Sequence, residues 1–191
     1  MPTDADLIQI VDAAMAEAAR RSGAWLACRP GCCQCCIGPF AITQLDAIRL
    51  QAGLTDLEVR DPERAARVRE RAQASVERMR REYPTDPLGS ALHREDAAED
   101  EPCPALDPAT GTCDLYAARP ITCRTFGPAA RFGAESLAVC ELCYQGATDA
   151  QIAACDVAAD PDNLEDELLR NLEHAGQAGE TVVAFALAVA S

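Results

Sequence analysis

The sequence predicts a small, mostly α-helical protein whose middle part is rich in loops. Helical periodicity is found towards both ends of the chain, and no alternation of strands and helices is visible. The stretch from 103 to 143 is dominated by turns, prolines and cysteines. Aromatic residues make up only 4% of the 191 residues, and much of the 49% hydrophobic content is alanine. Because alanine buries little apolar area, the predicted core is thin.

The first two helices are predicted from apolar spacing and capping residues. Apolar positions in residues 4–22 share one helical face, with Asp4 as a candidate cap and Gly23 just past the end. A second helix is expected from Thr43, which would cap it, to Gly53.

The later elements follow from proline and charge patterns. Pro62 suits the first position of a third helix that runs to about Glu82, and its dense Arg and Glu content favours a solvated outer layer. Residues 84–102 contain three prolines and the acidic groups 95–96 and 99–101, so we expect a solvated loop rather than a calcium loop. Helices are expected again from about Pro161 to His174 and over 179–190.

Charge excludes two classes of partner. The formal net charge is −14, with 31 acidic against 17 basic residues, and every basic residue is arginine. Such a chain is repelled by nucleic acid and by anionic lipid. The first residues do not resemble a signal peptide, and the apolar run 181–190 is about half of a membrane span. We therefore expect a cytoplasmic protein, and the Lys-free, Ala- and Arg-rich composition suggests a high-GC bacterial genome.

Eleven cysteines are the strongest chemical signal, and five of them fall between Cys28 and Cys36. In a reducing compartment, cysteines indicate metal binding or catalysis rather than a disulfide framework. Neighbouring cysteines such as Cys35 and Cys36 also cannot readily bridge each other. The sequence therefore favours free thiols that act as metal ligands.

Three Cys-x-x-Cys pairs support this interpretation, because metal sites often take two ligands from one tight turn. Two of the pairs interleave, so that Cys35 and Cys36 are neighbours whose side chains we expect to diverge. Either they serve two centres, or one of them is a packing residue. The packing alternative applies best to Cys33 and Cys155. The pairs are Cys32 with Cys35, Cys33 with Cys36, and Cys140 with Cys143.

Histidine adds little to this picture. His93 is expected in the polar loop, and His174 near a helix end, where its charge would suit the dipole. We prefer these structural interpretations to a ligand role. No serine motif of the hydrolase type is present, so acid–base hydrolysis has no visible machinery.

The cysteine pattern resembles the YkgJ-type cysteine-cluster family, which is described as zinc- or iron-chelating. The resemblance covers about residues 26–145 and rests on Cys28-x3-Cys32-x2-Cys35-Cys36, then on Pro102-Cys103-Pro104-Ala105-Leu106, Cys113-Asp114-Leu115-Tyr116 and Arg119-Pro120-Ile121-Thr122-Cys123-Arg124. Cys33 departs from the family pattern, which leaves open which pair binds.

The resemblance implies a set of thiolate ligands and a domain layout. The implied metal ligands are Cys28, Cys32, Cys35, Cys36, Cys103, Cys113 and Cys123, with Cys140 or Cys143 completing eight. We expect a single domain over 1–191, built as a small helical protein with a loop-rich, cysteine-ligated metal-centred core. The cysteine-cluster region 26–145 would contain a helical insert at about 43–82, with C-terminal helices over 148–191.

Thiolate centres carry negative charge that needs compensation, since four thiolates around a dication leave a net charge of about −2. Arg119 and Arg124 lie close in sequence to Cys123, and we expect them to supply hydrogen bonds and positive charge to the centre; the alternative is ion pairs with surface carboxylates. Tyr116 is expected to pack in the core.

Three functions are compatible with these patterns. The first is a protein that holds zinc or an iron–sulfur centre through thiolates, with the metal as structural element or cargo. The second is an iron–sulfur enzyme or redox protein, because flagellin lysine N-methylase has a similar cysteine cluster, which implies methyl transfer linked to S-adenosylmethionine. The third is an interaction module that would use the helix at 62–82. The metal, the number of centres and the oligomeric state are left open.

Overall fold

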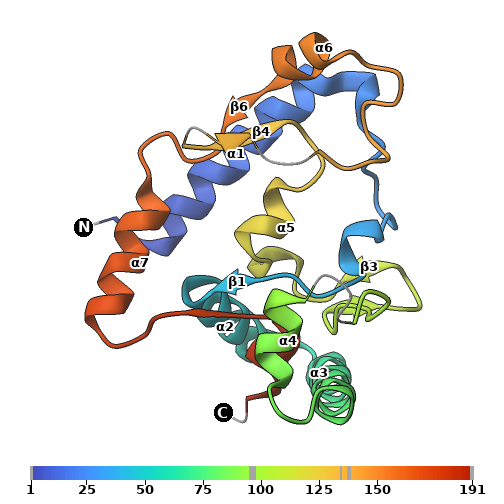
Figure 1. The fold of residues 1–191 in the computed structure, drawn as a ribbon, viewed down its shortest axis with the longest axis vertical. Helices are drawn as coiled ribbons and strands as arrows, with labels where there is room; N and C mark the ends of the chain where they lie inside the picture. The colour runs from blue at the N-terminus through green and yellow to red at the C-terminus, as the bar shows by residue number, and fades with distance from the viewer. Residues whose placement is uncertain (1, 95–97, 134, 137–138, 190–191) are drawn as a thin grey trace. The chain divides into compact units, whose positions relative to one another are not determined.

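The computed structural model describes residues 2–94, 98–133, 135–136 and 139–189 (Figure 1). It confirms a mostly α-helical protein with a few short strands. The chain divides into two compact units, each formed by two separate segments. Unit 1 contains Met1–Arg29 and Ile121–Gly176, and unit 2 contains Pro30–Pro120 and Gln177–Ser191. The single domain over 1–191 stays a prediction.

Unit 1 is built on one long helix, α1, which contacts the other helices of this unit and the small sheet (Figure 1). The sheet has the order β5-β4-β6, with β4 antiparallel to β5 and parallel to β6. Its elements are α1 (Asp4–Ser22), η1 (Gly23–Trp25), α5 (Ile121–Thr125), β4 (Ala130–Phe132), β5 (Glu135–Ser136), α6 (Asp149–Cys155), β6 (Val157–Ala158) and α7 (Leu164–His174).

Helix α1 confirms the predicted range 4–22, but its cap is Thr3 and not Asp4. The Thr3 hydroxyl accepts from Asp6 N–H, and Asp6 accepts from Thr3 N–H in return, which completes a capping box. Gly23 ends the helix with a φ of 52°, a conformation that favours glycine. The helix predicted from about Pro161 begins later, at Leu164, and ends at His174 as expected. Helix α6 lies within the range 148–191 where C-terminal helices were expected, although its own bounds were not predicted.

Tyr144 organises the packed interior of unit 1. Its side chain is buried with Cys140, Cys143 and Cys155, and partly buried apolar residues around η1 pack against this cluster. The Tyr144 hydroxyl lies 2.6 Å from Ser22 Oγ and accepts from Ala129 N–H at 2.8 Å. Three cysteines and Tyr144 thus pack together in the core of unit 1.

Unit 2 consists of helices and short strand pairs. The pair β1–β7 and the hairpin β2–β3 are both antiparallel. Its elements are η2 (Gln34–Cys36), β1 (Ile42–Thr43), α2 (Gln44–Arg60), α3 (Pro62–Glu82), α4 (Pro87–His93), β2 (Leu106–Asp107), β3 (Thr112–Cys113), η3 (Tyr116–Ala118), β7 (Glu180–Thr181) and α8 (Val183–Ala188).

Helix α2 begins as predicted, because the Thr43 hydroxyl accepts from Asp46 N–H. The predicted end at Gly53 is wrong, since the helix continues to Arg60. Gly53 does not terminate the helix but lies against η3: a Cβ atom added here would be 2.3 Å from Ala118 Cβ. The glycine therefore allows close packing.

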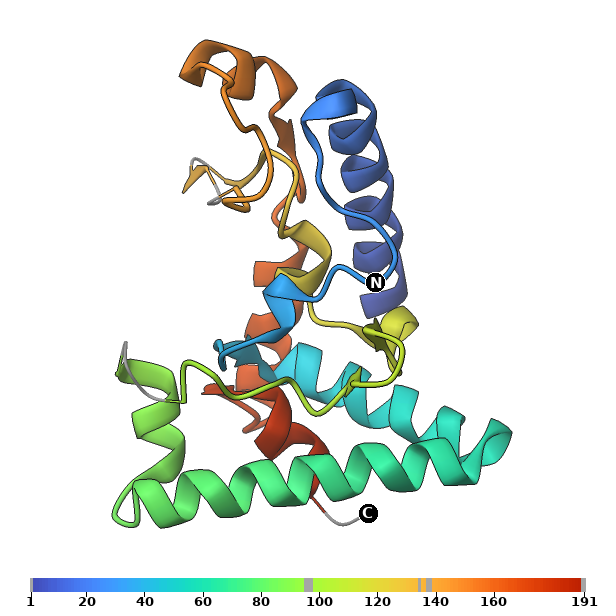
Figure 2. The same cartoon turned by 90° about the vertical axis from the view of Figure 1, so that its right-hand side faces the viewer.

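Helix α3 has the predicted range, with Asp61 as its cap and Pro62 at the first position; it is the long green helix of Figure 2. One face of it is buried, however. Its small and apolar residues face α2, α4 and α8, so the helix is an integral wall of unit 2 rather than only a solvated layer. The buried residues of α3 are Ala65, Val68, Ala72, Ser75, Val76 and Met79.

Two other sequence expectations in unit 2 need correction. The loop predicted over 84–102 contains helix α4, which Asp86 caps through Gly89 N–H and Pro87 begins. The acidic residues 95–96 of that prediction lie outside the described residues. The helix predicted over 179–190 is shorter, because β7 precedes it and α8 ends at Ala188, while its predicted last residue lies outside the described part of the chain.

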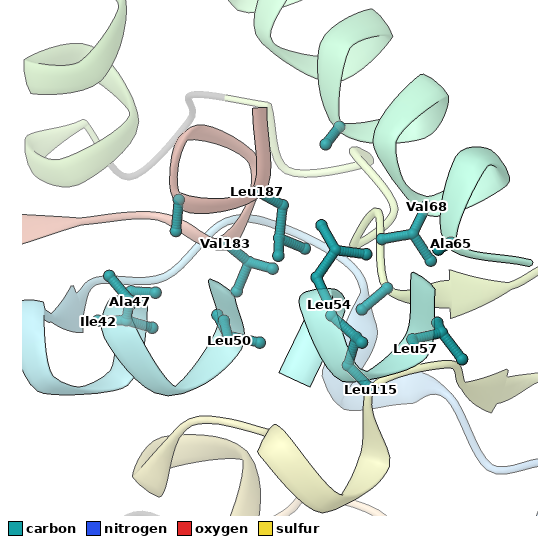
Figure 3. Packing of buried hydrophobic residues seen from close by; sticks show 13 residues of the cluster. Ile42, Ala47, Leu50, Leu54, Leu57, Ala65, Val68, Leu115, Val183 and Leu187 are labelled. Carbon is teal, nitrogen blue, oxygen red and sulfur yellow. The ribbon is translucent and has the colours of Figure 1, made fainter. Parts of the chain in front are cut away.

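The main core of unit 2 lies between α2, α3 and α8 (Figure 3). Leu50, Leu54 and Leu187 are almost completely buried at its centre. Cys103, which precedes the hairpin, and Cys113, which lies on its second strand, pack against this core from its edge. Apolar packing therefore fixes the backbone that carries these cysteines.

No helix among the described residues is long and apolar enough to span a membrane.

Candidate metal centre

The front cysteine loop pairs with the segment before Cys103. In unit 2 the tight turn η2 is closed by Cys36 N–H, which donates to Cys33 O at 2.8 Å. Cys103 N–H then donates to Cys36 O at 2.7 Å, and Ile37 forms an antiparallel bridge with Pro102. These backbone contacts place two predicted ligands, Cys36 and Cys103, next to each other.

The hairpin β2–β3 adds Cys113. Leu106 pairs with Cys113 in the hairpin register, and Asp114 N–H donates to Ala105 O at 2.7 Å. Gly111 makes the turn with a φ of +67°, which other residues rarely adopt. The hairpin thus returns Cys113 to the side of Cys103.

Backbone N–H groups are directed at these sulfurs. The Ala105 N–H group donates to the Cys103 sulfur and that of Leu115 to the Cys113 sulfur, while Leu106 N–H donates to the carbonyl oxygen of Cys103 at 2.9 Å. Burial nevertheless raises the pKa of Cys103 to about 11, with the neighbouring Cys113 adding to the rise. Burial is also the main cause of the raised pKa of Cys113. Such thiols stay protonated at neutral pH unless a cation takes the place of the proton.

Cys35 and Cys36 are in direct contact, so the expectation that their side chains diverge is wrong. A hydrogen bond between the two thiols lowers the pKa of Cys35 to about 6 and raises that of Cys36. Burial and the charges of Cys35, Cys103 and Cys113 further raise the pKa of Cys36. Sulfurs from three segments therefore interact electrostatically in unit 2.

The two predicted counter-charges have different surroundings. Arg119 is close enough for its charge to favour the thiolates of Cys35 and Cys113, and its guanidinium stacks 3.9 Å from the centroid of the Tyr116 ring. Tyr116 is 62% exposed, so its expected core position is wrong. Arg124, in unit 1, is buried and donates to both carboxylate oxygens of Asp12 at 2.7 and 2.8 Å.

A second set of thiols lies within unit 1. The Leu142 N–H group donates to the Cys140 sulfur, and Ala27 N–H donates to Cys143 Sγ at 3.5 Å. Cys143 N–H donates to the carbonyl oxygen of Cys140 at 2.8 Å. Cys28 follows Ala27 in the chain. Its Sγ is 2.8 Å from the place where a Cβ atom on Gly127 would lie.

Gly127 connects these groups, because it forms a bridge with Val139, the residue before Cys140. This part of unit 1 thus brings Cys28 towards the pair Cys140 and Cys143. Cys123 lies on α5, four residues before Gly127.

The remaining sulfur and nitrogen candidates lie elsewhere. The Cys155 thiol is buried and donates to the carbonyls of Arg21 and Gln151, as expected of a packing residue. His93 ends α4 instead of lying in a loop, and His174 ends α7, where a cationic ring suits the helix dipole.

The thiols do not form a closed ligand shell. Within the described part of the chain, no group of three or more His, Cys, Asp or Glu side chains is arranged so that it could hold a metal ion. The chemistry of the donors nevertheless fits a thiolate-bound metal: the groups contain only sulfur, which suits zinc and iron–sulfur centres, and backbone N–H groups already point at the sulfurs. For several sulfurs to bind one ion, the cysteine side chains would have to change their orientation.

The sequence did not indicate that α3 takes part in this region. Arg64 and Arg71 of α3 both pair with Asp114, the residue after Cys113, and the Asp114 side chain is 2% exposed. A signal was present: the two arginines are two helical turns apart, on the side that carries Val68 and Ala72. The high total charge of the helix obscured it.

Comparison with known proteins gives one match. No curated protein and no solved structure matches the chain significantly. A family model named CxxCxxCC, described as "Putative zinc- or iron-chelating domain", matches residues 27–144, which is more than half of the chain. That span includes the front loop, the hairpin and both sets of thiols. The chain therefore belongs to the CxxCxxCC family of cysteine-cluster domains.

Proposed function

We propose that the chain binds zinc or an iron centre through a thiolate group in unit 2 that consists of Cys36, Cys103 and Cys113, with Cys35 or Cys32 as the fourth ligand. The carrying observation is the convergence of the front loop and the hairpin, joined by Cys103 N–H and Cys36 O at 2.7 Å. Backbone amides support the sulfurs of Cys103 and Cys113, which is what desolvated thiolates require.

Four thiolates suit a closed, structural site. Burial raises the pKa of Cys103 to about 11, so a cation that binds its sulfur at neutral pH has to displace the proton. When bound, the ion would link the front loop to the hairpin through its sulfur ligands. In a unit whose aromatic content is low, that link would add stability that apolar packing alone does not provide. The metal is then a structural element or the cargo of the protein.

We further propose that the thiols of unit 1 hold a second ion, with Cys140 and Cys143 as the central pair and Cys28 and Cys123 as the other ligands. The hydrogen bonds from Leu142 and Ala27 N–H to the two central sulfurs support this assignment. Each unit would then contain its own four-cysteine centre, and the interleaved Cys-x-x-Cys pairs of the front loop need not share one ion.

Elemental analysis of full-length protein purified without oxygen tests both assignments. We expect about two zinc ions per chain, or iron with acid-labile sulfide. Cys103→Ser should remove metal from the centre in unit 2, and Cys140→Ser from the centre in unit 1. Cys155→Ser is the matched control, because its buried thiol bonds only to backbone carbonyls in the described contacts. Wild-type protein that is purified without oxygen and contains neither zinc nor iron in proportion to the chain would refute the proposal.

One observation favours a second candidate, an iron–sulfur enzyme with methyl-transfer chemistry linked to S-adenosylmethionine. A cavity of about 370 Å³ begins at Ile37, the residue after Cys36, and His93, Arg94 and Glu99 also line it. A substrate in this cavity would lie beside the proposed centre. Brown protein with acid-labile sulfide that binds S-adenosylmethionine would favour this candidate, and colourless zinc protein would exclude it.

A further inference from the structure

Asp114 is a buried carboxylate that two arginines of α3 hold from one side. Arg64 Nε lies 2.5 Å from Asp114 Oδ1, and an Arg71 terminal nitrogen lies 2.5 Å from Asp114 Oδ2. The Asp114 side chain is only 2% exposed, whereas the arginines are 37% and 25% exposed. Both carboxylate oxygens are therefore satisfied, as a buried anion requires.

Arg71 makes a second contact with the same region. Its Nε donates to the carbonyl oxygen of Pro104 at 2.8 Å. Pro104 directly follows Cys103, and Asp114 directly follows Cys113. A single planar guanidinium thus spans the two backbone segments that carry two of the proposed ligands.

The support behind Arg71 is rigid. The neighbouring positions Val68 and Ala72 are completely buried in the core of unit 2, so the helix cannot rotate without loss of packing. Ala105 and Leu115, which follow the two cysteine segments, pack into the same core. The position of Arg71 relative to the hairpin is therefore set by the fold.

We propose that Arg71 is a positioning residue of the metal centre, which holds the Cys103 and Cys113 segments at the spacing that the ion requires, with Arg64 and Asp114 completing the arrangement. This inference rests on the proposed function of unit 2. Its physical basis is preorganisation: ligands that are already held lose less conformational freedom when the ion binds.

The test compares three variants of the full-length protein in a zinc competition assay against a chromophoric chelator. Residues that orient metal ligands typically contribute about 10- to 100-fold to metal affinity, so we expect Arg71→Gln to weaken zinc binding by about that factor. Arg67→Gln is the matched control, because Arg67 lies one turn earlier on an exposed position of α3. It should bind zinc as the wild type does.

Arg71→Lys distinguishes positioning from charge alone. An ammonium group keeps the charge but cannot reproduce the planar fork that reaches both Pro104 O and Asp114. We expect Arg71→Lys to bind zinc more weakly than the wild type, as Arg71→Gln does. After substitution with cobalt, it should also show an altered thiolate-to-cobalt charge-transfer spectrum. Full recovery of affinity by Arg71→Lys would overturn the inference, as would wild-type affinity in Arg71→Gln.

A second variant covers the case in which Arg71→Gln does not fold. Asp114→Asn is nearly isosteric and removes the charge that both arginines bind, so it should weaken zinc binding and alter the cobalt spectrum in the same way. Unchanged affinity and spectrum in that variant would also overturn the inference. If the wild-type protein itself binds no metal, the proposed function fails; if only the variants behave as wild type, the positioning role alone fails.

Discussion

Replacement of Gly53 by alanine tests the packing of α2 on η3. An alanine in the middle of a helix normally stabilises it by about 1 kcal/mol relative to glycine. Here the added Cβ would lie 2.3 Å from Ala118 Cβ, whereas an ordinary contact is 3.4–4 Å, so one element must move by more than 1 Å. Overpacking of this kind costs about 1–3 kcal/mol. We therefore expect Gly53→Ala to lower the free energy of unfolding by about 1 kcal/mol net.

A double-mutant cycle separates the clash from helix propensity. Ala118→Gly removes the methyl group that the new side chain would meet, so the double variant Gly53→Ala/Ala118→Gly should recover stability, with a coupling energy of about 1–3 kcal/mol. Urea unfolding followed by circular dichroism, at equal metal content, measures all four proteins. The reasoning is refuted if Gly53→Ala is more stable than the wild type, since the helix would then have free space at this position.

Two further predictions concern unit 1. Tyr144→Phe should lower the free energy of unfolding by about 1–3 kcal/mol in urea denaturation, because it leaves Ala129 N–H and the Ser22 hydroxyl without the buried Tyr144 oxygen; an unchanged midpoint would contradict this. Glu17→Gln should lower the melting temperature slightly at neutral pH, because hydrogen bonds from Arg20 and Arg21 lower the pKa of Glu17 from 4.5 to about 2. Because the pKa of Glu17 is lower in the folded state than in the unfolded state, its contribution to stability is lost as pH falls from about 4.5 towards 2. The difference in melting temperature between variant and wild type should therefore shrink over that range, and also in high salt. A difference in melting temperature that grows on acidification would contradict the prediction.

Local signals predicted individual elements well where the chain carries caps and prolines. Thr43 and the pair Asp61-Pro62 mark helix starts in sequence, because a side-chain oxygen or a missing N–H meets the needs of a helix start without any distant partner. Gly53 misled the prediction for the opposite reason. Its role depends on Ala118, which is distant in sequence, so a helix that continues could not be told from one that ends.

In the candidate metal centre, too, local sequence features could be predicted, whereas contacts between distant residues could not. The spacing of the cysteines and the family resemblance are enough to indicate thiolate metal binding, and the family match agrees with that. The sequence could not show that Cys35 and Cys36 contact each other, or that Arg71 reaches both Pro104 and Asp114. Hydropathy assigns every arginine of α3 to the solvent-exposed face of the helix. An arginine can nevertheless point towards the interior when a buried carboxylate pairs with it, so the inward role of Arg71 could not be predicted from hydropathy.

The sequence by itself indicated that this protein is mostly helical and belongs with cysteine-rich metal-binding chains, since helix caps and cysteine spacing are local properties. Only the tertiary structure decided which thiols share a unit and what holds them. Cys36 with the hairpin belongs to unit 2, and Cys140 with Cys143 belongs to unit 1. Those groupings arise from backbone pairing and ion pairs between residues far apart in the chain, whose energies depend on three-dimensional distance.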